Sequence, residues 1–298
     1  MKLAVNYSGP VASLLRDQQI QFEYFKCPAW LDLVGTVQEI QPTYVHFPLK
    51  VGTGIGDAID LETKQTPDWG KVEALLNQTD TTLINLHLSP SIQDYPNIPA
   101  DTIDQNHIEM LIENMVKDVA AVVKRFGAEN VIVENDHDFG NTHLQPASLP
   151  EVICQVVQET DCGFLLDIAH ASLAANALNS DVREYICALP VSSICEVHVT
   201  GVQRFESYWI ERLHKAGVDT SNVQHFVGKL VDHLPMTEAD WELFGWSMEQ
   251  VHREKWKRPW AVTFEYGGIS PLYAAITDVD VLTHQIPKLH SIINSSEI

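Results

Sequence analysis

Carboxylates and histidines stand at the ends of apolar, strand-like segments of this sequence, where they could bind a metal ion. The clearest case is residues 163–170, in which an apolar run ends on Asp167 and His170 follows three residues later. Side chains alternate along a strand, so Leu165 and Asp167 share one face. A carboxylate at the last inward position needs a metal ion, another cation or hydrogen-bond donors, because an unpaired charge is costly in an apolar interior. Taken alone, Asp167 could equally cap the helix that follows it.

The same arrangement recurs on the strand-like segments 43–46, 82–87, 130–134, 194–198 and 261–265. Six ionisable residues in phase are hard to explain as isolated helix caps. Histidine and carboxylate ligands without a thiolate suit Mn²⁺, Fe²⁺ or Zn²⁺ better than Ca²⁺. The residues that end the six segments are His46, His87, Glu134, Asp167, His198 and Glu265.

The number of these residues predicts more than one metal ion. Together with His170 the set offers seven ligands, which exceeds what one ion takes from a protein when open positions remain. We therefore expect two or three divalent ions per chain, with Glu134 or Glu265 as a bridge, and these two glutamates are the candidate catalytic residues. One ion is predicted on the side of His46, His87 and Glu134, and a second is predicted to bind a subset of Glu134, Asp167, His198 and Glu265.

Helix-like segments separate the strands and must hold them in place. Eight strands alternating with helices, without a break in composition, predict an α/β protein with a single (β/α)₈ TIM-barrel domain over residues 1–298. A long loop insertion is expected at about 201–235, with a short helix at about 205–216. The carboxyl ends of barrel strands converge on one face, so the six candidate ligands would meet at one mouth. The other predicted strands are 3–6 and 22–26, and the predicted helices are 11–18, 29–40, 68–78, 103–126, 149–159, 237–253 and 279–293.

A glycine-rich segment at 51–56 superficially resembles a dinucleotide-binding fingerprint. The fingerprint requires glycines that open a helix, whereas this segment continues into the polar stretch 60–67. We therefore expect a flexible loop above the barrel rather than a nucleotide site.

Composition limits the classes of partner. The 298 residues include 19 Lys and Arg against 40 Asp and Glu, for a formal net charge of −21. This excess opposes nucleic acid and anionic membranes as partners, because phosphate groups attract cations. Five cysteines without a CxxC pair, no signal peptide after Met1, and no apolar run near the roughly 20 residues of a membrane span predict a cytoplasmic protein.

Several short motifs, taken in order, resemble those of the xylose-isomerase-like TIM barrel superfamily. Within it, the chain resembles the multinuclear-iron enzymes that modify ribosomally made peptides. These are relatives of the methanobactin-biosynthesis oxidase, which forms oxazolone and thioamide from a peptide cysteine. His46 and His87-Leu88 fall where that family places its two early histidines, and the resemblance covers roughly residues 40–270. The other motifs are Glu134-Asn135, Leu-Leu-Asp167-Ile-Ala-His170, Glu196-Val-His198-Val-Thr-Gly201 and Thr-Phe-Glu265-Tyr.

The resemblance implies iron as the metal and a peptide or another small thiol-bearing substrate, which a partner protein could present. It implies an oxidative reaction in which the barrel fixes the open coordination positions and keeps bulk water out. The family carries Asp-x-His between the seventh and eighth strands, whereas Asp232 and His233 are adjacent here. On this basis His233 is a candidate ligand that, with His170, is left for a weaker third metal position.

Three other functions stay open at this point. Glu134, Asp167, His198 and Glu265 also resemble the single-metal set of sugar isomerases and epimerases, in which two glutamates move a proton. Phosphodiester hydrolysis at a trinuclear zinc site is opposed by the net charge of −21. A metal-dependent scaffold without catalysis would have a closed site with no position for substrate.

Overall fold

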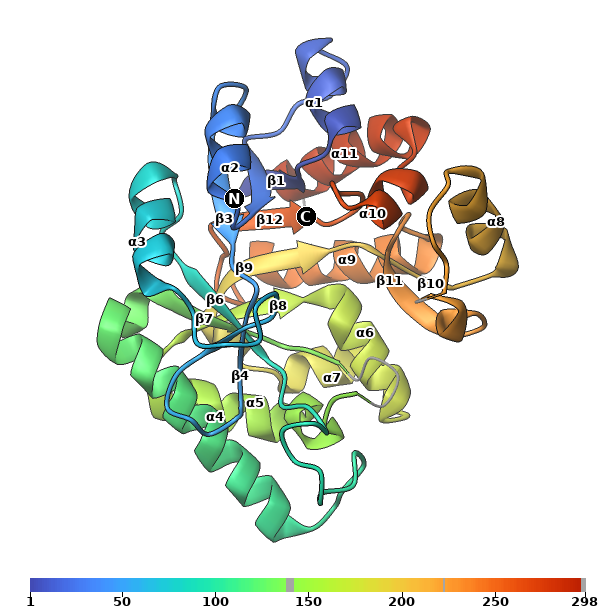
Figure 1. Cartoon of the computed structure of the whole chain (residues 1–298). Helices are drawn as coiled ribbons and strands as arrows, with labels where there is room; N and C mark the ends of the chain where they lie inside the picture. The colour runs from blue at the N-terminus through green and yellow to red at the C-terminus, as the bar shows by residue number, and fades with distance from the viewer. Residues whose placement is uncertain (138–141, 222, 296–298) are drawn as a thin grey trace.

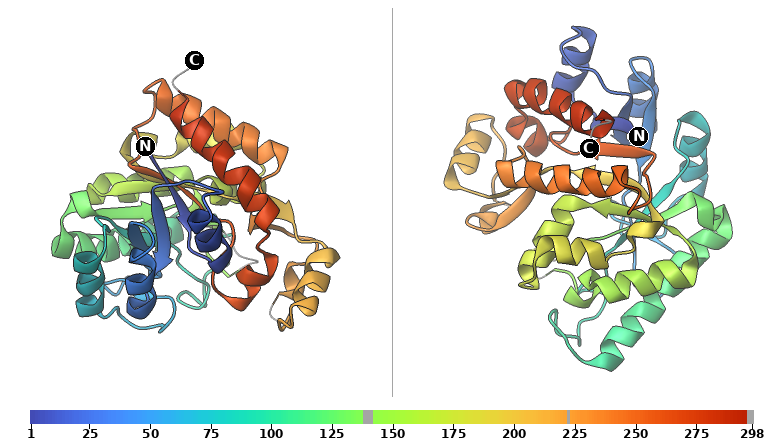
Figure 2. Two further views of the ribbon diagram at one scale, coloured as in Figure 1. Left: turned by 90° about the horizontal axis from the view of Figure 1, so that it is seen from above. Right: turned by 180° about the vertical axis from the view of Figure 1, so that it is seen from behind.

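The computed structural model describes residues 1–137, 142–221 and 223–295, and a curled sheet of parallel strands surrounded by helices forms its centre (Figures 1 and 2). Hydrogen-bonded neighbours follow the order β3-β2-β1-β12-β9-β8-β7-β6-β4, and the short β5 (Ile59–Asp60) extends β4. This arrangement confirms the predicted TIM barrel. The barrel strands are β1 (Lys2–Asn6), β2 (Tyr24–Pro28), β3 (Thr43–His46), β4 (Leu49–Val51), β6 (Ile84–Leu88), β7 (Val131–Glu134), β8 (Gly163–Asp167), β9 (Ile194–Val199) and β12 (Ala261–Phe264).

Amphipathic helices cover the outside of the barrel. In α4, for example, Leu111, Met115 and Val119 form a buried stripe at helical spacing, as the sequence predicts. No helix in the described part of the chain is both long and apolar enough to cross a membrane. The helices are α1 (Gly9–Arg16), α2 (Leu31–Gln38), α3 (Trp69–Gln78), α4 (Gln105–Phe126), α5 (Pro150–Thr160), α6 (Ile168–Ala177), α7 (Val182–Ala188), α8 (Ser207–Lys215), α9 (Glu238–His252), α10 (Pro271–Ile276) and α11 (Val279–Asn294), with 3₁₀ turns at Ala128–Asn130, Gln145–Ser148, Val191–Ser193 and Gln224–Phe226.

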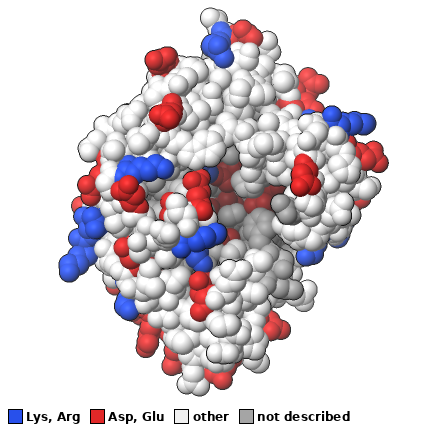
Figure 3. All heavy atoms as spheres, in the orientation of Figure 1, with Lys and Arg blue, Asp and Glu red and all other residues white. Residues whose placement is uncertain are grey.

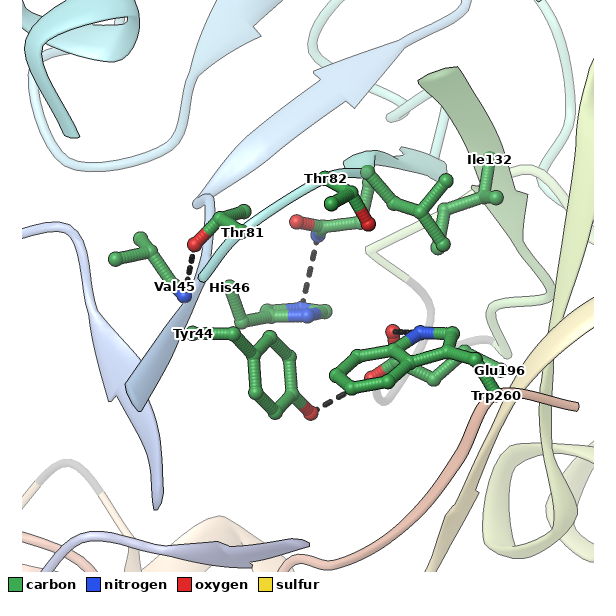
Figure 4. A pocket seen from close by; sticks show the side chains of 10 residues that line it. Tyr44, Val45, His46, Thr81, Thr82, Ile132, Glu196 and Trp260 are labelled. Atoms are coloured by element: carbon green, nitrogen blue, oxygen red, sulfur yellow. Dashed lines mark hydrogen bonds between the residues drawn. The ribbon is translucent and has the colours of Figure 1, made fainter. Parts of the chain in front are cut away.

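The third barrel strand is split into β3 and β4 by Phe47 and Pro48. β3 pairs with β2, β4 pairs with β6, and the chain between them closes the barrel. At the split, side chains make hydrogen bonds to the backbone in place of those between paired strands. The Asn85 Oδ1 accepts from the Phe47 N–H at 2.7 Å, its Nδ2 donates to the Phe47 carbonyl at 2.9 Å, and Thr81 Oγ1 accepts from the Val45 N–H at 2.7 Å. Figure 4 looks into this part of the barrel interior.

Two predicted strands are displaced by two residues at their start. The strand predicted at 22–26 runs over Tyr24–Pro28, because its pairing with β3 carries it past the charged Lys26. The strand predicted at 82–87 runs over Ile84–Leu88, since the preceding Thr81 uses its hydroxyl to bridge to β3. Contacts between strands determine where these two strands begin and end, and the local sequence pattern does not contain that information.

The glycine-rich loop after β4 is held in place by a carboxylate, so the expectation of a flexible loop is wrong. Asp118 on α4 is fully buried and accepts four backbone N–H groups at 2.7–3.0 Å. These come from Gly52, Thr53, Gly54 and Gly56. The three glycines have φ between +76° and +110°, a region that favours glycine. The loop is a nest for an anion that the protein itself supplies.

In the segment 201–235, where an insertion is expected, the described residues form a small unit outside the barrel sheet and beside the barrel mouth (Figure 1). β10 (Gly201–Arg204) and β11 (Leu230–Leu234) form an antiparallel pair, and the predicted helix is α8, at Ser207–Lys215. Trp209 and Leu213 from α8 pack with Val231 and Leu234 of β11 in a small core of their own. The insertion therefore presents the carboxyl-terminal half of β11 toward the barrel.

Candidate metal centre

Glu134 lies at the centre of the barrel mouth, surrounded by four imidazoles. Its Oε2 is 3.5 Å from His46 Nε2 and 3.3 Å from His87 Nδ1. Its Oε1 is 3.6 Å from His170 Nδ1 and 3.7 Å from His198 Nδ1. These residues come from the ends of four strands and the first turn of α6, as the counting of strand ends predicts. Figure 3 shows the hollow above them, with acidic side chains inside it.

Asp167 and Glu265 complete a second side of the same cluster. Asp167, His198 and Glu265 offer ligand atoms that all lie within 4.8 Å of one another, and His198 Nδ1 is 3.0 Å from Glu265 Oε1. Asp167 also caps α6, since its Oδ1 accepts the His170 N–H at 2.8 Å. The Oδ1 atom of Asp167 therefore forms the cap, and its Oδ2 has no hydrogen-bond partner among the described residues. The structure brings all six strand-end residues together at one mouth.

The ligand atoms are grouped differently from the two predicted sets. His46, Glu134 and His198 form one group within 4.8 Å, and Glu134, Asp167 and His170 form another. His87 joins the first side through Glu134 and through His46, whose Nε2 is 3.3 Å from His87 Nε2. His170 thus lies with Glu134 and Asp167, beside the centre of the cluster.

The chemistry of these donors fits a divalent metal ion. Glu134 Oε2, Asp167 Oδ2 and His198 Nδ1 are buried, and none has a hydrogen-bond partner among the described residues. Burial, followed by the charge of Lys26, holds the pKa of His46 and of His198 well below the ordinary range. Burial lowers the pKa of His87 to about 4, so these three rings are neutral and keep a lone pair for a metal. Burial also raises the pKa of Glu134 to about 8, although the charges of His170 and Lys26 act in the opposite direction.

Hydrogen bonds from beneath orient His198. Its Nε2 lies 2.8 Å from Glu196 Oε1 and donates there, which leaves Nδ1 directed at Glu134 and Glu265. Glu196 is fixed in turn by the Tyr44 hydroxyl at 2.6 Å and by Trp260 Nε1 at 3.2 Å (Figure 4). A carboxylate behind a histidine is the usual support of a metal-binding imidazole.

A β-bulge brings Asp232 and His233 to the same face of β11. Gly201 pairs with Leu234 and Gln203 pairs with Val231, so β11 carries one extra residue between these pairs. His233 has a φ of +57° at this point, and its Nε2 is 3.8 Å from Asp232 Oδ2. Adjacent residues of a regular strand would point to opposite faces. The bulge therefore compensates locally for the missing residue between the two.

His170 connects this pair to the centre of the site. Its Nδ1 is 2.9 Å from the Asn135 carbonyl, to which it donates, and its Nε2 is 3.2 Å from Asp232 Oδ2. His233 Nδ1 is directed at the Glu265 carbonyl, 2.8 Å away. The structure thus places His170, Asp232 and His233 in a row that runs from Glu134 toward the edge of the cluster.

Sequence reasoning missed three residues at the mouth. Lys26, in the middle of β2, contacts the Glu265 carboxylate, and burial lowers its pKa to about 8. Lys26 ends the predicted strand 22–26, two residues after Tyr24. An ionisable residue at the end of a predicted strand is also the signal that identified the other candidate residues. Asp136 and His137 follow β7 and offer ligand atoms within 4.8 Å of one of His170.

A cavity of about 460 Å³ opens above the cluster. Its floor includes His46, His87 and Glu134. Its walls are largely apolar and aromatic, as at Trp30 and Tyr273. This is a concave pocket with a few converging polar groups, the form that a substrate site takes.

Solved structures with the same architecture show the fold of this chain. A xylose isomerase domain-containing protein of Salmonella typhimurium aligns with a TM-score of 0.55 at 15% identity, over 99% of this chain and 97% of that one. A D-tagatose 3-epimerase-like protein aligns with a TM-score of 0.51 at 13% identity, over 99% of this chain and 98% of that one. At these identities the likeness identifies a xylose-isomerase-like TIM barrel and no activity.

Sequence relatives and a family match lead further. A UPF0276 protein of Bordetella bronchiseptica is 24% identical over 153 residues, 50% of this chain and 45% of that protein, and one of Chromobacterium violaceum is 24% identical over 220 residues, 72% of this chain and 74% of that protein. The chain spans about half the length of the Bordetella relative and of several others that it matches. The family described as RiPP precursor modification enzyme MbnB/TglH/ChrH matches residues 30–242, most of the chain. This protein therefore belongs to the MbnB/TglH/ChrH family of enzymes that modify the precursors of ribosomally made peptides.

Proposed function

We propose that this chain is a metal-dependent oxidoreductase that holds two or three iron ions and oxidatively modifies a peptide or another small thiol-bearing substrate. The observation that carries the proposal is the position of Glu134, a buried carboxylate with four imidazoles at 3.3–3.7 Å. A family whose name specifies peptide precursors supports the peptide as substrate. In this proposal residues 1–298 form one barrel domain, to which the insertion contributes Asp232 and His233.

Each part of the cluster has a role in this proposal. Iron, when bound, supplies the redox chemistry that couples oxidation of the substrate to reduction of dioxygen. Burial keeps the imidazoles of His46, His87 and His198 neutral, and Glu196 orients His198. The apolar walls of the cavity exclude water from the reacting group. His46, Glu134 and His198 form one compact group, and Glu134, Asp167 and His170 form another. The ligands we assign are the eight predicted residues His46, His87, Glu134, Asp167, His170, His198, His233 and Glu265.

A single-metal sugar isomerase or epimerase is the second candidate. The observation that favours it is the compact group of Asp167, His198 and Glu265, which with Glu134 resembles the set such enzymes use. Against it, His46 and His87 lie 3.5 Å and 3.3 Å from Glu134 and would have no role at a single ion. The two candidates therefore differ first in the number of metal ions.

Metal stoichiometry separates these candidates. We expect elemental analysis to find at least two iron ions per chain, both in protein purified without added metal and after anaerobic loading with Fe(II). One equivalent that does not increase on loading would contradict the oxidoreductase and favour the isomerase. As a second measurement, the iron-loaded protein should consume dioxygen with a cysteine-containing peptide and not with the matched serine peptide.

A further inference from the structure

A lysine occupies the candidate metal centre. Lys26 lies in the middle of β2 with a side chain only 10% exposed, and it contacts Glu265 Oε1. Among the described residues that line the cavity, it is the sole lysine or arginine. A buried ammonium is costly unless it is paired, so its position within a cluster of metal-ligating groups needs a reason.

Lys26 and a metal ion would compete for the same oxygen. Glu265 Oε1 is also 3.0 Å from His198 Nδ1, and with Asp167 these residues form one of the candidate metal groups. A divalent ion bound there would repel the ammonium, because like charges at such short distances interact strongly in a buried site. With metal present, Lys26 therefore needs a different anion.

The cavity itself offers no such anion among the described residues outside the proposed ligands. Glu62 is the remaining carboxylate of the lining, and it accepts from Trp30 Nε1 at 3.1 Å on the exposed rim. Ser270 caps α10 through the Tyr273 N–H at 3.2 Å. The charge of Glu196 also acts on Lys26, but the oxygens of Glu196 are already engaged by Tyr44, His198 and Trp260. The remaining source of an anion is the substrate.

We propose that Lys26 binds an anionic group of the substrate, a thiolate or a carboxylate, beside the metal ions. This inference rests on the proposed function, since it places the substrate in the same cavity. In the metal-free chain, Lys26 holds Glu265 in place, and metal loading frees the ammonium for the substrate. Lys26 is thereby a substrate-binding residue and does not ligate metal.

Three small probes test this binding. N-acetylcysteine carries a thiol and a carboxylate, N-acetylcysteine amide carries only the thiol, and N-acetylserine carries only the carboxylate. Their dissociation constants are measured by calorimetry under anaerobic conditions on the iron-loaded wild type, Lys26→Met and Lys26→Arg. Lys50→Met is the matched control, because Lys50 is also buried and paired, with Asp94 at 2.6 Å, yet does not line the cavity.

We expect Lys26→Met to weaken binding about 10-fold to 100-fold, as for the loss of a charge-assisted hydrogen bond in a buried site. If the partner is the carboxylate, N-acetylcysteine and N-acetylserine lose affinity and the amide does not. If it is the thiolate, both cysteine probes lose affinity. Lys26→Arg should restore most of the binding, and Lys50→Met should bind like the wild type.

Metal content measured on the same samples keeps the inference separate from the proposed function. It should be unchanged in Lys26→Met. Equal affinities in Lys26→Met and wild type, loss of metal in Lys26→Met, or no probe binding by the loaded wild type would each overturn the role of Lys26. A single metal equivalent in the wild type would instead overturn the proposed function.

Discussion

Asp118 and Glu134 are both buried carboxylates near the mouth of the barrel, but the protein treats them in opposite ways. Asp118 accepts four backbone N–H groups from the loop 52–56 at 2.7–3.0 Å. Glu134 is 1% exposed, and its Oε2 has no hydrogen-bond partner among the described residues. Protein donors satisfy the first carboxylate, whereas the second is left for a cation. Hydrogen-bond satisfaction thus separates a structural carboxylate from a candidate ligand where burial does not.

Replacing Glu134 should have the largest effect on metal binding. Glu134→Gln keeps the shape of the side chain but removes the charge at the centre of four imidazoles, so we expect nearly all metal to be lost. Elemental analysis and circular dichroism together measure metal content and folding. Full metal content in this variant would show that Glu134 is not a ligand.

The double change His46→Ala/His87→Ala should have the next largest effect. These residues contact Oε2 of Glu134, whereas His170 and His198 contact its Oε1, so the variant should lose about one equivalent of metal and keep the rest. Elemental analysis after loading with Fe(II) measures this. A single equivalent before the change that survives it untouched would contradict a multinuclear site.

Removing the charge behind His198 should weaken metal binding without changing the number of sites. Glu196→Gln no longer holds His198 Nε2 as a carboxylate does, and such supporting groups are worth about 10-fold to 100-fold in metal affinity. Titration against a chelator of known affinity measures the change. Tyr44→Phe, which removes one donor to Glu196, is the milder control. Unchanged metal affinity in both variants would show that Glu196 does not support the metal site.

Asp118→Asn should leave metal content unchanged. It turns an acceptor of four N–H groups into a poor match for them, so the free energy of unfolding should fall by about 2–3 kcal/mol. Urea unfolding measures stability, and elemental analysis provides the comparison with Glu134→Gln. If Asp118→Asn lost metal but kept its free energy of unfolding, the roles that we assign to Asp118 and Glu134 would be reversed.

The strand ends could be predicted from sequence because an alternating pattern places His46 and Glu134 on the inner face wherever the barrel closes. The role of Asp118 could not, because the donors that satisfy it lie in a loop remote in sequence. Lys26 was missed since a strand that ends on a cation resembles a solvated end. The convergence of Asp232 and His233 depends on a bulge and a left-handed backbone, which no periodicity encodes.

The pairing of the first barrel strand with the last has a consequence for how the chain matures. β1 lies between β2 and β12, with Lys2 opposite Ala261 and Val5 opposite Phe264. During synthesis β1 therefore keeps an open edge until β12 emerges, and such late, long-range pairing is slow and prone to association with other chains. Glu265 follows β12 directly, so the cluster is complete only after this final pairing. The metal centre can therefore form only after the last strand has been synthesised and the barrel has closed.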